Sequence, residues 1–344
     1  MSKKIIIKNL ESLKASGIVS PLKSDSLKEV ANRFSVSITP TIVNSIKSSS
    51  SGAVFSQYVP SIDELSVKED ELRDPIGDDP YTPIKGITHR YPDRVLFKPI
   101  HTCAVYCRFC FRRDKVGRAD QALNSEETKA ALEYIRKCKG VWEVILSGGD
   151  PLVMSPNKLA EIFSELEKIS HVKVIRIHTR VPLVAPEKIN KQLLQSLKTD
   201  KALFVVIHCN SHEEINNDVS DSLKRISDSG VPLLSQSVLL RNVNADPVLL
   251  EKLFRTLIEN RVKPYYLHHA DKAEGTSHFR TSIQDGRECM EKLRGNVSGI
   301  CLPQYVLDIP GGKGKVPIGP VYLNDYEEGY QVKDWQGCEH IYKD

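Results

Sequence analysis

Short apolar segments alternate with amphipathic ones along most of the chain after Arg94, and this alternation constrains the fold more than any other feature. The apolar segments are RVLFKPI, VWEVILSGGD, VKVIRIHTR, ALFVVIHCN, VPLLSQSVLL and KPYYLHHAD. Each is followed by a segment with helical periodicity, from SEETKAALEYIRKC after the first to IQDGRECMEKLRG after the last. Strand–helix units in this succession predict a parallel sheet with helical crossovers.

Polar residues stand where the expected strands end. SGGD closes the second strand, HTR the third and HHAD the sixth, and a cysteine-rich loop follows the first. The carboxyl ends of the strands gather around one axis in a barrel, whereas an open sheet concentrates its site at one switch point. The spread over successive strand ends therefore favours an α/β fold with a partial (β/α)6 barrel, similar to a TIM barrel.

The segments that flank the repeating units predict two smaller parts. Residues 1–79 are polar with helical fragments, and we expect an N-terminal helical arm or subdomain there. RDPIGDDPYTPIKG, rich in proline, glycine and aspartate, is typical of a connector. Residues 80–305 would form the barrel, and residues 306–344 a short C-terminal segment.

Composition limits the partners and the location. The net charge is only +4 over 344 residues, and no block of lysine and arginine is long enough for a nucleic-acid arm. No apolar run approaches the roughly 20 residues that span a bilayer. The N-terminus has a three-residue apolar run before Lys8, too short for a secretory signal. Scattered cysteines outside one cluster are typical of a reducing compartment, so we expect the cytoplasm.

That cluster is the stretch HTCAVYCRFCFRRD, which places Cys103, Cys107 and Cys110 within eight residues. A structural zinc site needs four ligands, and no second cysteine pair follows. His101 could add an imidazole, so zinc remains an alternative. An iron–sulfur cluster held by three thiolates instead leaves one iron open for a further ligand.

Two glycine-rich segments suggest further ligands. In SGGDPL, Gly148 and Gly149 follow a strand and let a ligand approach the backbone, and Asp150 offers a partner for an ammonium group. In DIPGGKGKVP, a lysine on a glycine-rich segment suits a Schiff base with an aldehyde such as pyridoxal phosphate. Arg90 and Arg94 in HRYPDR suit the phosphate, because a guanidinium fork matches its oxygens.

The cysteine spacing with Phe109 before the last cysteine is similar to the CxxxCxΦC motif of the radical S-adenosylmethionine superfamily, in which Φ is aromatic. Within it, the chain resembles the lysine 2,3-aminomutase family from roughly Pro83 to Pro320. The segments that carry the resemblance occur in the family's order: HRYPDRVL, CAVYCRFCFRR, SGGDPL, SQSVLLRNVN, HFRT, LRGNVSG and DIPGGKGKVP.

The resemblance implies three cofactors, a 4Fe–4S cluster, S-adenosyl-L-methionine and pyridoxal 5′-phosphate, and one amino-acid substrate. The implied cluster ligands are Cys103, Cys107 and Cys110. Positions implied to contact S-adenosylmethionine are Gly148, Gly149, Asp150, His208 and Gln236. Lys315 would bind pyridoxal phosphate covalently, with Arg90 and Arg94 on its phosphate side. The substrate would contact Arg112 through its carboxylate and Asp271 and Asp308 through its distal ammonium.

The resemblance also implies an isomerase that converts L-α-lysine to β-lysine. A 5′-deoxyadenosyl radical would remove a hydrogen from Cβ, the nitrogen would migrate, and hydrogen would return at Cα. Such an enzyme needs a one-electron reductant such as flavodoxin or ferredoxin. One alternative is the branch of the family that makes (R)-β-lysine for elongation factor P. Another, of a different class, is a non-catalytic iron–sulfur or zinc-binding module.

The chain departs from the family pattern in two places. Lys313 interrupts the glycine run and competes with Lys315, which we favour because of its distance to Pro317. Longer family members carry a cysteine-rich C-terminal extension that binds zinc between subunits, whereas only Cys338 stands in that region here. We therefore expect no structural zinc and a smaller homo-oligomer.

Overall fold

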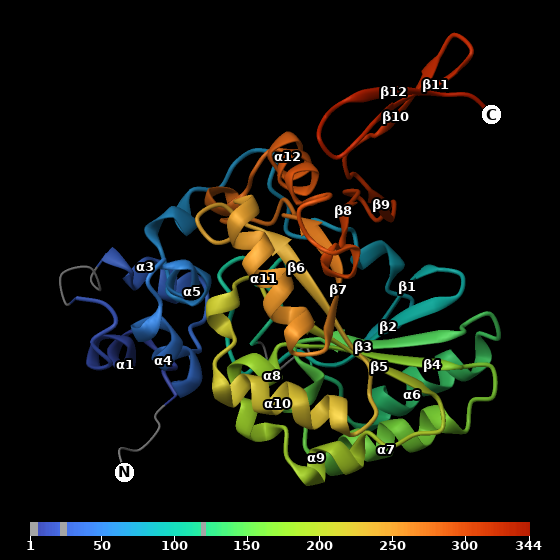
Figure 1. Cartoon of the computed structure of the whole chain (residues 1–344). Helices are drawn as coiled ribbons and strands as arrows, with labels where there is room; N and C mark the ends of the chain where they lie inside the picture. Colours follow the sequence, from blue (N-terminus) through green and yellow to red (C-terminus); the bar gives the residue numbers. More distant parts are fainter. Residues whose placement is uncertain (1–5, 21–25, 118–121) are drawn as a thin grey trace.

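The computed structural model describes residues 6–20, 26–117 and 122–344. At its centre lies a nine-stranded sheet with the strands in chain order, β1 to β9, and this sheet curls into an open half-barrel (Figure 1). Strands β2 to β8 are parallel, while β1 and β9 run antiparallel at the two edges. The predicted partial barrel is confirmed.

The strands are β1 (Ile87–Tyr91), β2 (Arg94–Ile100), β3 (Glu143–Gly148), β4 (Val174–Thr179), β5 (Ala202–His208), β6 (Leu233–Leu239), β7 (Val262–His269), β8 (Gln304–Asp308) and β9 (Lys315–Pro317). The main crossover helices are α6 (Ser125–Lys137), α7 (Pro156–Glu167), α9 (Lys191–Ser196), α10 (Asn217–Asp228), α11 (Pro247–Glu259) and α12 (Ile283–Leu293). The six predicted strands are β2 to β7. The short β8 was not predicted, and it spans the boundary expected at residue 305.

Local sequence sets the ends of these helices. Asn124 caps α6 and forms a capping box with Glu127, and the helix buries Ala131, Leu132 and Ile135 on one face. The third crossover, EKINKQLLQSLKT, was predicted as one helix, but its α-helix is shorter than the segment. Its helix α9 has six residues, because the Asn190 side chain accepts a hydrogen bond from the Leu193 amide and starts a new helix there.

The two-residue period of the strands separates core from cavity. On β6, Ser235, Ser237 and Leu239 are buried in the wall, whereas Gln236 and Val238 line the interior of the half-barrel. On β8 every second residue lines the cavity, namely Gln304, Val306 and Asp308, and the cavity-lining residues of β7 include His268. The sheet thus presents side chains that are far apart in sequence to one interior space.

Two smaller parts flank the half-barrel (Figure 1). The N-terminal helices are α1 (Leu10–Ala15), α3 (Lys28–Arg33), α4 (Pro40–Ser48) and α5 (Ala53–Tyr58). Residues 1–5 and 21–25 of the expected arm lie outside the described residues. At the other end, β10 (Leu323–Tyr326), β11 (Gly329–Lys333) and β12 (Glu339–Tyr342) form a separate antiparallel sheet that projects from the body.

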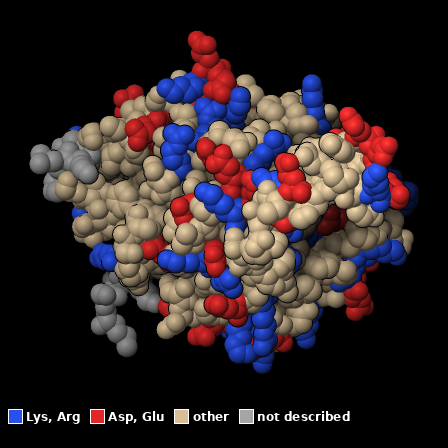
Figure 2. All heavy atoms as spheres, turned by 45° about the horizontal axis from the view of Figure 1, so that its top comes forward, with Lys and Arg blue, Asp and Glu red and all other residues tan. Residues whose placement is uncertain are grey.

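Two observations concern the surface charge and the length of the helices. On the face turned toward the viewer in Figure 2, basic and acidic side chains are interspersed rather than gathered by sign. Among the described helices, none is both long and apolar enough to cross a membrane.

A buried carboxylate ties the N-terminal part to the cysteine-rich loop. The Glu64 side chain has no solvent exposure and pairs with Arg108, whose Nη2 lies 2.5 Å from Glu64 Oε2 and whose Nε lies 3.0 Å from Oε1. Arg113 contacts the same carboxylate. Burial alone would raise the pKa of Glu64, but the two guanidinium groups outweigh it and lower that pKa.

We expect Glu64→Gln to destabilise the protein by about 3–5 kcal/mol, because it leaves two buried guanidinium groups without a counter-charge. Urea unfolding followed by circular dichroism measures the change. Glu69→Gln, at an exposed position in the same segment, is the matched control and should leave the midpoint nearly unchanged. Equal midpoints for the two variants would contradict this account of Glu64.

Candidate active site

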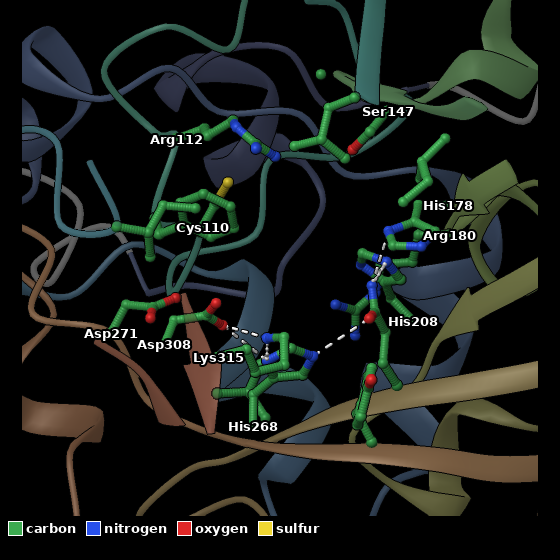
Figure 3. Close-up of a pocket in the computed structure, with 18 of the residues that line it drawn as sticks. Cys110, Arg112, Ser147, His178, Arg180, His208, His268, Asp271, Asp308 and Lys315 are labelled. Atoms are coloured by element: carbon green, nitrogen blue, oxygen red, sulfur yellow. Dashed lines mark hydrogen bonds and ion pairs between the residues drawn. The ribbon is translucent and has the colours of Figure 1, made fainter. Parts of the chain in front are cut away.

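A cavity of about 660 Å³ fills the interior of the half-barrel. Every residue to which the family resemblance gave a role lines it, although these residues span positions 90 to 315. They are Arg90, Arg94, Cys103, Cys107, Cys110, Arg112, Gly148, Gly149, Asp150, His208, Gln236, Asp271, Asp308 and Lys315. Figure 3 shows several of them facing one space from different strands and loops.

The three cysteines lie on one wall, in the loop after β2. All three thiols are free, and Arg180 Nη1 donates a hydrogen bond to Cys107 Sγ at 3.5 Å. Burial raises the pKa of each thiol, that of Cys107 to about 11, although Arg180 partly opposes this. Binding to iron would replace the proton by a cation, which removes the cost of burying a thiolate.

His101 does not join this wall. Its side chain faces a separate small pocket beside Lys98 and Arg112, and burial lowers its pKa to about 4. Within the described ranges, no three His, Cys, Asp or Glu side chains converge closely enough to hold a single metal ion. The zinc alternative with His101 as fourth ligand is therefore not assembled. An iron–sulfur cluster takes each thiolate on a different iron, so it does not need three ligands to meet at one ion.

The glycine pair at the end of β3, Gly148 and Gly149, supports the cysteine loop. A Cβ on Gly149 would lie 2.4 Å from the Thr102 carbonyl oxygen, and one on Gly148 would lie 2.6 Å from that of Ile100. Gly148 also has φ +101°, which favours glycine. The group that lies close to these glycines in the structure is thus the backbone that leads into the cysteine loop. Contact with a ligand remains a prediction.

Asp150 lines the cavity, but protein donors occupy both of its carboxylate oxygens. Thr179 Oγ1 donates at 2.7 Å and the Arg180 amide at 2.7 Å, while the amides of Val181 and Leu152 donate at 3.1 Å. Burial raises the pKa of Asp150 against these hydrogen bonds. In the structure, Asp150 therefore holds the turn after β4, which carries Arg180. A direct contact between Asp150 and an ammonium group stays a prediction.

A buried aspartate that the sequence analysis missed links two of the arginines. Asp78 Oδ2 accepts from Arg112 Nη2 at 2.7 Å, and Asp78 Oδ1 accepts from Arg90 Nη2 at 3.1 Å. Burial alone would raise the pKa of Asp78, but Arg112, Lys98 and Arg90 lower it. The segment that carries Asp78 had the composition of a connector, so its sequence gave no signal of a buried charge.

Arg94 is engaged differently from Arg90. Its guanidinium lies 3.8 Å from the centre of the Tyr91 ring and pairs with Asp93 at 2.7 Å. Within the part of the chain that the structure describes, the buried Nε atoms of Arg90 and Arg180 have no hydrogen-bond partner. Donors that are buried but unpaired are costly, and a bound anion would satisfy them.

Lys315, at the start of the edge strand β9, lines the cavity with its side chain. Its Nζ forms an ion pair with Asp308 and lies 3.2 Å from Nδ1 of His268 (Figure 3). Lys313, the competing lysine, is exposed and does not line the cavity. Gly314, between the two, has φ +97°, which lets the chain turn so that successive lysines face opposite ways.

Two acids lie beside Lys315. Burial and the neighbouring Asp308 raise the pKa of Asp271 to about 7. At Asp308 burial acts in the same direction, but His268 and Lys315 outweigh it and lower the pKa. The cavity therefore holds one paired carboxylate and one carboxyl group that lacks a full counter-charge.

A network of three histidines around Gln236 crosses the cavity. Gln236 Nε2 lies 2.6 Å from His208 Nε2 and 3.1 Å from His178 Nδ1, and Gln236 Oε1 lies 3.2 Å from His268 Nε2. Burial lowers the pKa of all three imidazoles, that of His208 to about 3. His178 and His268 were not assigned from the sequence. Their position at strand ends, in HTR and HHAD, was the available signal.

Comparisons with known proteins find relatives that match most of the chain. The model of the radical SAM superfamily matches residues 97–251, and a model described as lysine-2,3-aminomutase matches residues 290–343. The chain is 42% identical to an L-lysine 2,3-aminomutase of Methanococcus maripaludis over 86% of this chain and 69% of that protein. It is 38% identical to an L-lysine 2,3-aminomutase of Acetoanaerobium sticklandii, over 92% and 77% of the two chains. A glutamate 2,3-aminomutase of Clostridioides difficile is 33% identical, over 92% and 75%.

Proposed function

We propose how the site works on the premise that this chain belongs to the lysine 2,3-aminomutase family of radical S-adenosylmethionine enzymes. The protein is an isomerase that converts L-α-lysine to β-lysine, and its cofactors are a 4Fe–4S cluster, S-adenosylmethionine and pyridoxal phosphate. The observation that carries the residue assignments is the single cavity, which presents three thiols, a lysine, a buried arginine and two acids to one another.

The residues fit these cofactors. Cys103, Cys107 and Cys110 would hold the cluster, and Lys315 would hold pyridoxal phosphate with help from Arg90 and Arg94. S-adenosylmethionine would lie between them, against Gly148, Gly149, His208 and Gln236. When bound, the cluster supplies the electron that cleaves S-adenosylmethionine, and pyridoxal phosphate supplies the conjugated ring that stabilises an unpaired electron next to the migrating nitrogen.

The charges of the cavity suit an amino acid with a cationic tail. Arg112 would take the carboxylate, while Asp271 and Asp308 would take the ε-ammonium group. In the absence of substrate, Asp78 neutralises Arg112 and Lys315 neutralises Asp308. Substrate binding would exchange these internal ion pairs for ion pairs with the ligand, so no charge is left buried alone. A glutamate side chain would face two carboxylates and be repelled.

Substrate choice tests this function directly. The reconstituted enzyme is given L-lysine or L-glutamate, and amino-acid products and 5′-deoxyadenosine are measured under anaerobic conditions. We expect β-lysine from lysine and no β-amino acid from glutamate. Chiral analysis of the product separates the (S) form from the (R) form that the elongation factor P branch makes. Turnover of glutamate at the rate of lysine would contradict the assignment of Asp271 and Asp308.

The raised pKa of Asp271, about 7, predicts a pH dependence of substrate affinity. Below pH 7 this carboxyl is protonated, so an ammonium ligand must displace a proton in order to bind. We expect KM for lysine to rise about tenfold as pH falls from 8 to 6. In Asp271→Asn, KM should be higher and nearly flat over that range. A variant with the same pH slope as the wild type would show that another group titrates.

The electron donor, the oligomeric state and the location are further parts of the proposal. We infer that the enzyme receives its electron from a small carrier such as flavodoxin or ferredoxin, forms a homo-oligomer and works in the cytoplasm. Support for a reducing location comes from the eight cysteines, all of which are free. Reduction of the reconstituted cluster by purified flavodoxin, followed by electron paramagnetic resonance, tests the first of these.

A further inference from the structure

His268, near the end of β7, lies between the reactive lysine and the histidine network. Its Nδ1 is 3.2 Å from Lys315 Nζ and 3.4 Å from Asp308 Oδ2, and its Nε2 is 3.2 Å from Gln236 Oε1. The neighbouring His269 lies on the opposite face of the strand. Its Nδ1 is 2.8 Å from the Tyr305 hydroxyl, and the residue does not line the cavity. Figure 3 shows His268 directly beside Lys315.

The hydrogen bonds of Gln236 fix which nitrogen of His268 carries the proton. The Gln236 amide nitrogen lies between His208 and His178, and it can donate one hydrogen to each. Its oxygen must then accept from Nε2 of His268. The proton of the neutral imidazole is therefore on Nε2, and the lone pair of Nδ1 faces Lys315.

The surroundings keep this imidazole neutral. Burial lowers the pKa of His268, and the positive charge of Lys315 lowers it further, against the raising effect of Asp308. The other groups that face it are the ring of Tyr266 at 5.6 Å between centroids and the uncharged amide of Gln236. A neutral imidazole with its lone pair toward an ammonium group is positioned as a proton acceptor.

We propose that His268 is the base that removes a proton from Lys315 when the ε-amino group attacks an aldehyde. The Nζ–H bond breaks, its electron pair forms the new bond to the carbonyl carbon, and the proton moves to Nδ1. In all, the ammonium gives up two protons, and both leave with the carbonyl oxygen as water. Asp308 stabilises the imidazolium by its charge. The inference rests on the proposed function in taking pyridoxal phosphate as the aldehyde.

Asp308 is the other candidate base, because its carboxylate also contacts Lys315. Its pKa is lowered by His268 and Lys315 despite burial, so its carboxylate holds a proton more weakly than an ordinary aspartate. A carboxylate of such low basicity is a poor acceptor for a proton. Asp308 therefore serves as the counter-charge, and His268, whose Nδ1 lies 3.2 Å from Lys315 Nζ while its Nε2 is bonded to Gln236, accepts the proton.

The test uses apoprotein and measures attachment rather than turnover. Pyridoxal phosphate is added to wild-type, His268→Gln and His269→Gln proteins, borohydride traps the covalent adduct at successive times, and mass spectrometry of the Lys315 peptide gives the rate. We expect attachment about 10²-fold slower in His268→Gln, the usual size of a general-base effect, and unchanged in His269→Gln. Added imidazole should restore part of the rate in His268→Ala.

A second measurement separates proton transfer from positioning. The affinity for 4′-deoxypyridoxine 5′-phosphate, which lacks the aldehyde, should stay within about twofold of wild type in His268→Gln, since general-base catalysis acts on the attack and not on binding. An attachment rate equal to that of wild type would overturn the proposal. So would a loss of analogue affinity parallel to the loss of rate, without rescue by imidazole. Failure of wild-type protein to bind the analogue would overturn the proposed function and the inference with it.

Discussion

Lys315→Ala should keep the iron and sulfide content of the wild type but form no covalent adduct with pyridoxal phosphate and no β-lysine. The side chain enters the cavity from β9, and its Nζ pairs with Asp308 and His268, whereas the three cysteines belong to the loop after β2. Its removal leaves Nδ1 of His268 3.4 Å from the Asp308 carboxylate, where the imidazole can take up a proton and supply the counter-charge. We therefore expect a folded, cluster-loaded protein whose turnover is below about one thousandth of the wild-type value.

Borohydride trapping, iron and sulfide analysis and product assay on the same preparation measure these quantities. Lys313→Ala is the matched control, because Lys313 lies two residues away, is exposed and does not line the cavity. It should trap pyridoxal phosphate as the wild type does. Trapping on Lys313 rather than on Lys315 would reverse the choice between the two lysines.

Cys107→Ser should abolish the cluster and, with it, cleavage of S-adenosylmethionine. Cys107 is the thiol that Arg180 approaches, and the buried pair of Arg180 with Glu214, at 2.6 Å, holds that guanidinium in place. A serine hydroxyl is far harder to deprotonate than a thiol, so it cannot replace the thiolate as a ligand. We expect iron content below about a tenth of wild type, since the loss of one ligand commonly costs a metal site most of its affinity.

Iron and sulfide analysis and the yield of 5′-deoxyadenosine after dithionite reduction measure this loss. Cys338→Ser is the control, because Cys338 is exposed and lies in the projecting C-terminal part. It should load and react as the wild type does. A Cys107→Ser protein with full cluster content would remove this thiol from the ligand set.

The fold was predictable because its signals are local and repeated. Each strand from β2 to β7 is an apolar run bounded by turn residues, and the period of its neighbours changes to that of a helix. The strand β8 was not predicted, because it has five residues and is followed by the glycine-rich segment rather than by a helix. The break in the crossover before β5 was not predicted, because Asn190 starts a new helix inside what looks like one helical pattern in the sequence.

Which residues line the cavity was predictable from the sequence only where a motif carries them. Residues that pair with the motif residues were not predicted, because pairing depends on positions far apart in the chain. Asp78 meets Arg112 across 34 residues and His268 meets Lys315 across 47. Asp150 shows the reverse case, since its motif suggested a ligand contact while its oxygens hold the turn after β4. Such partners become visible only when the strands are assembled.

The central claim is that one cavity holds the radical source and the lysine substrate together. Its most direct test is a single incubation of reconstituted enzyme with lysine that carries deuterium at C3. We expect β-lysine with deuterium at C2 and deuterium in 5′-deoxyadenosine, because the same adenosyl carbon removes and returns hydrogen. β-Lysine whose C2 hydrogen comes only from solvent, or the absence of β-lysine from a fully loaded enzyme, would contradict the account.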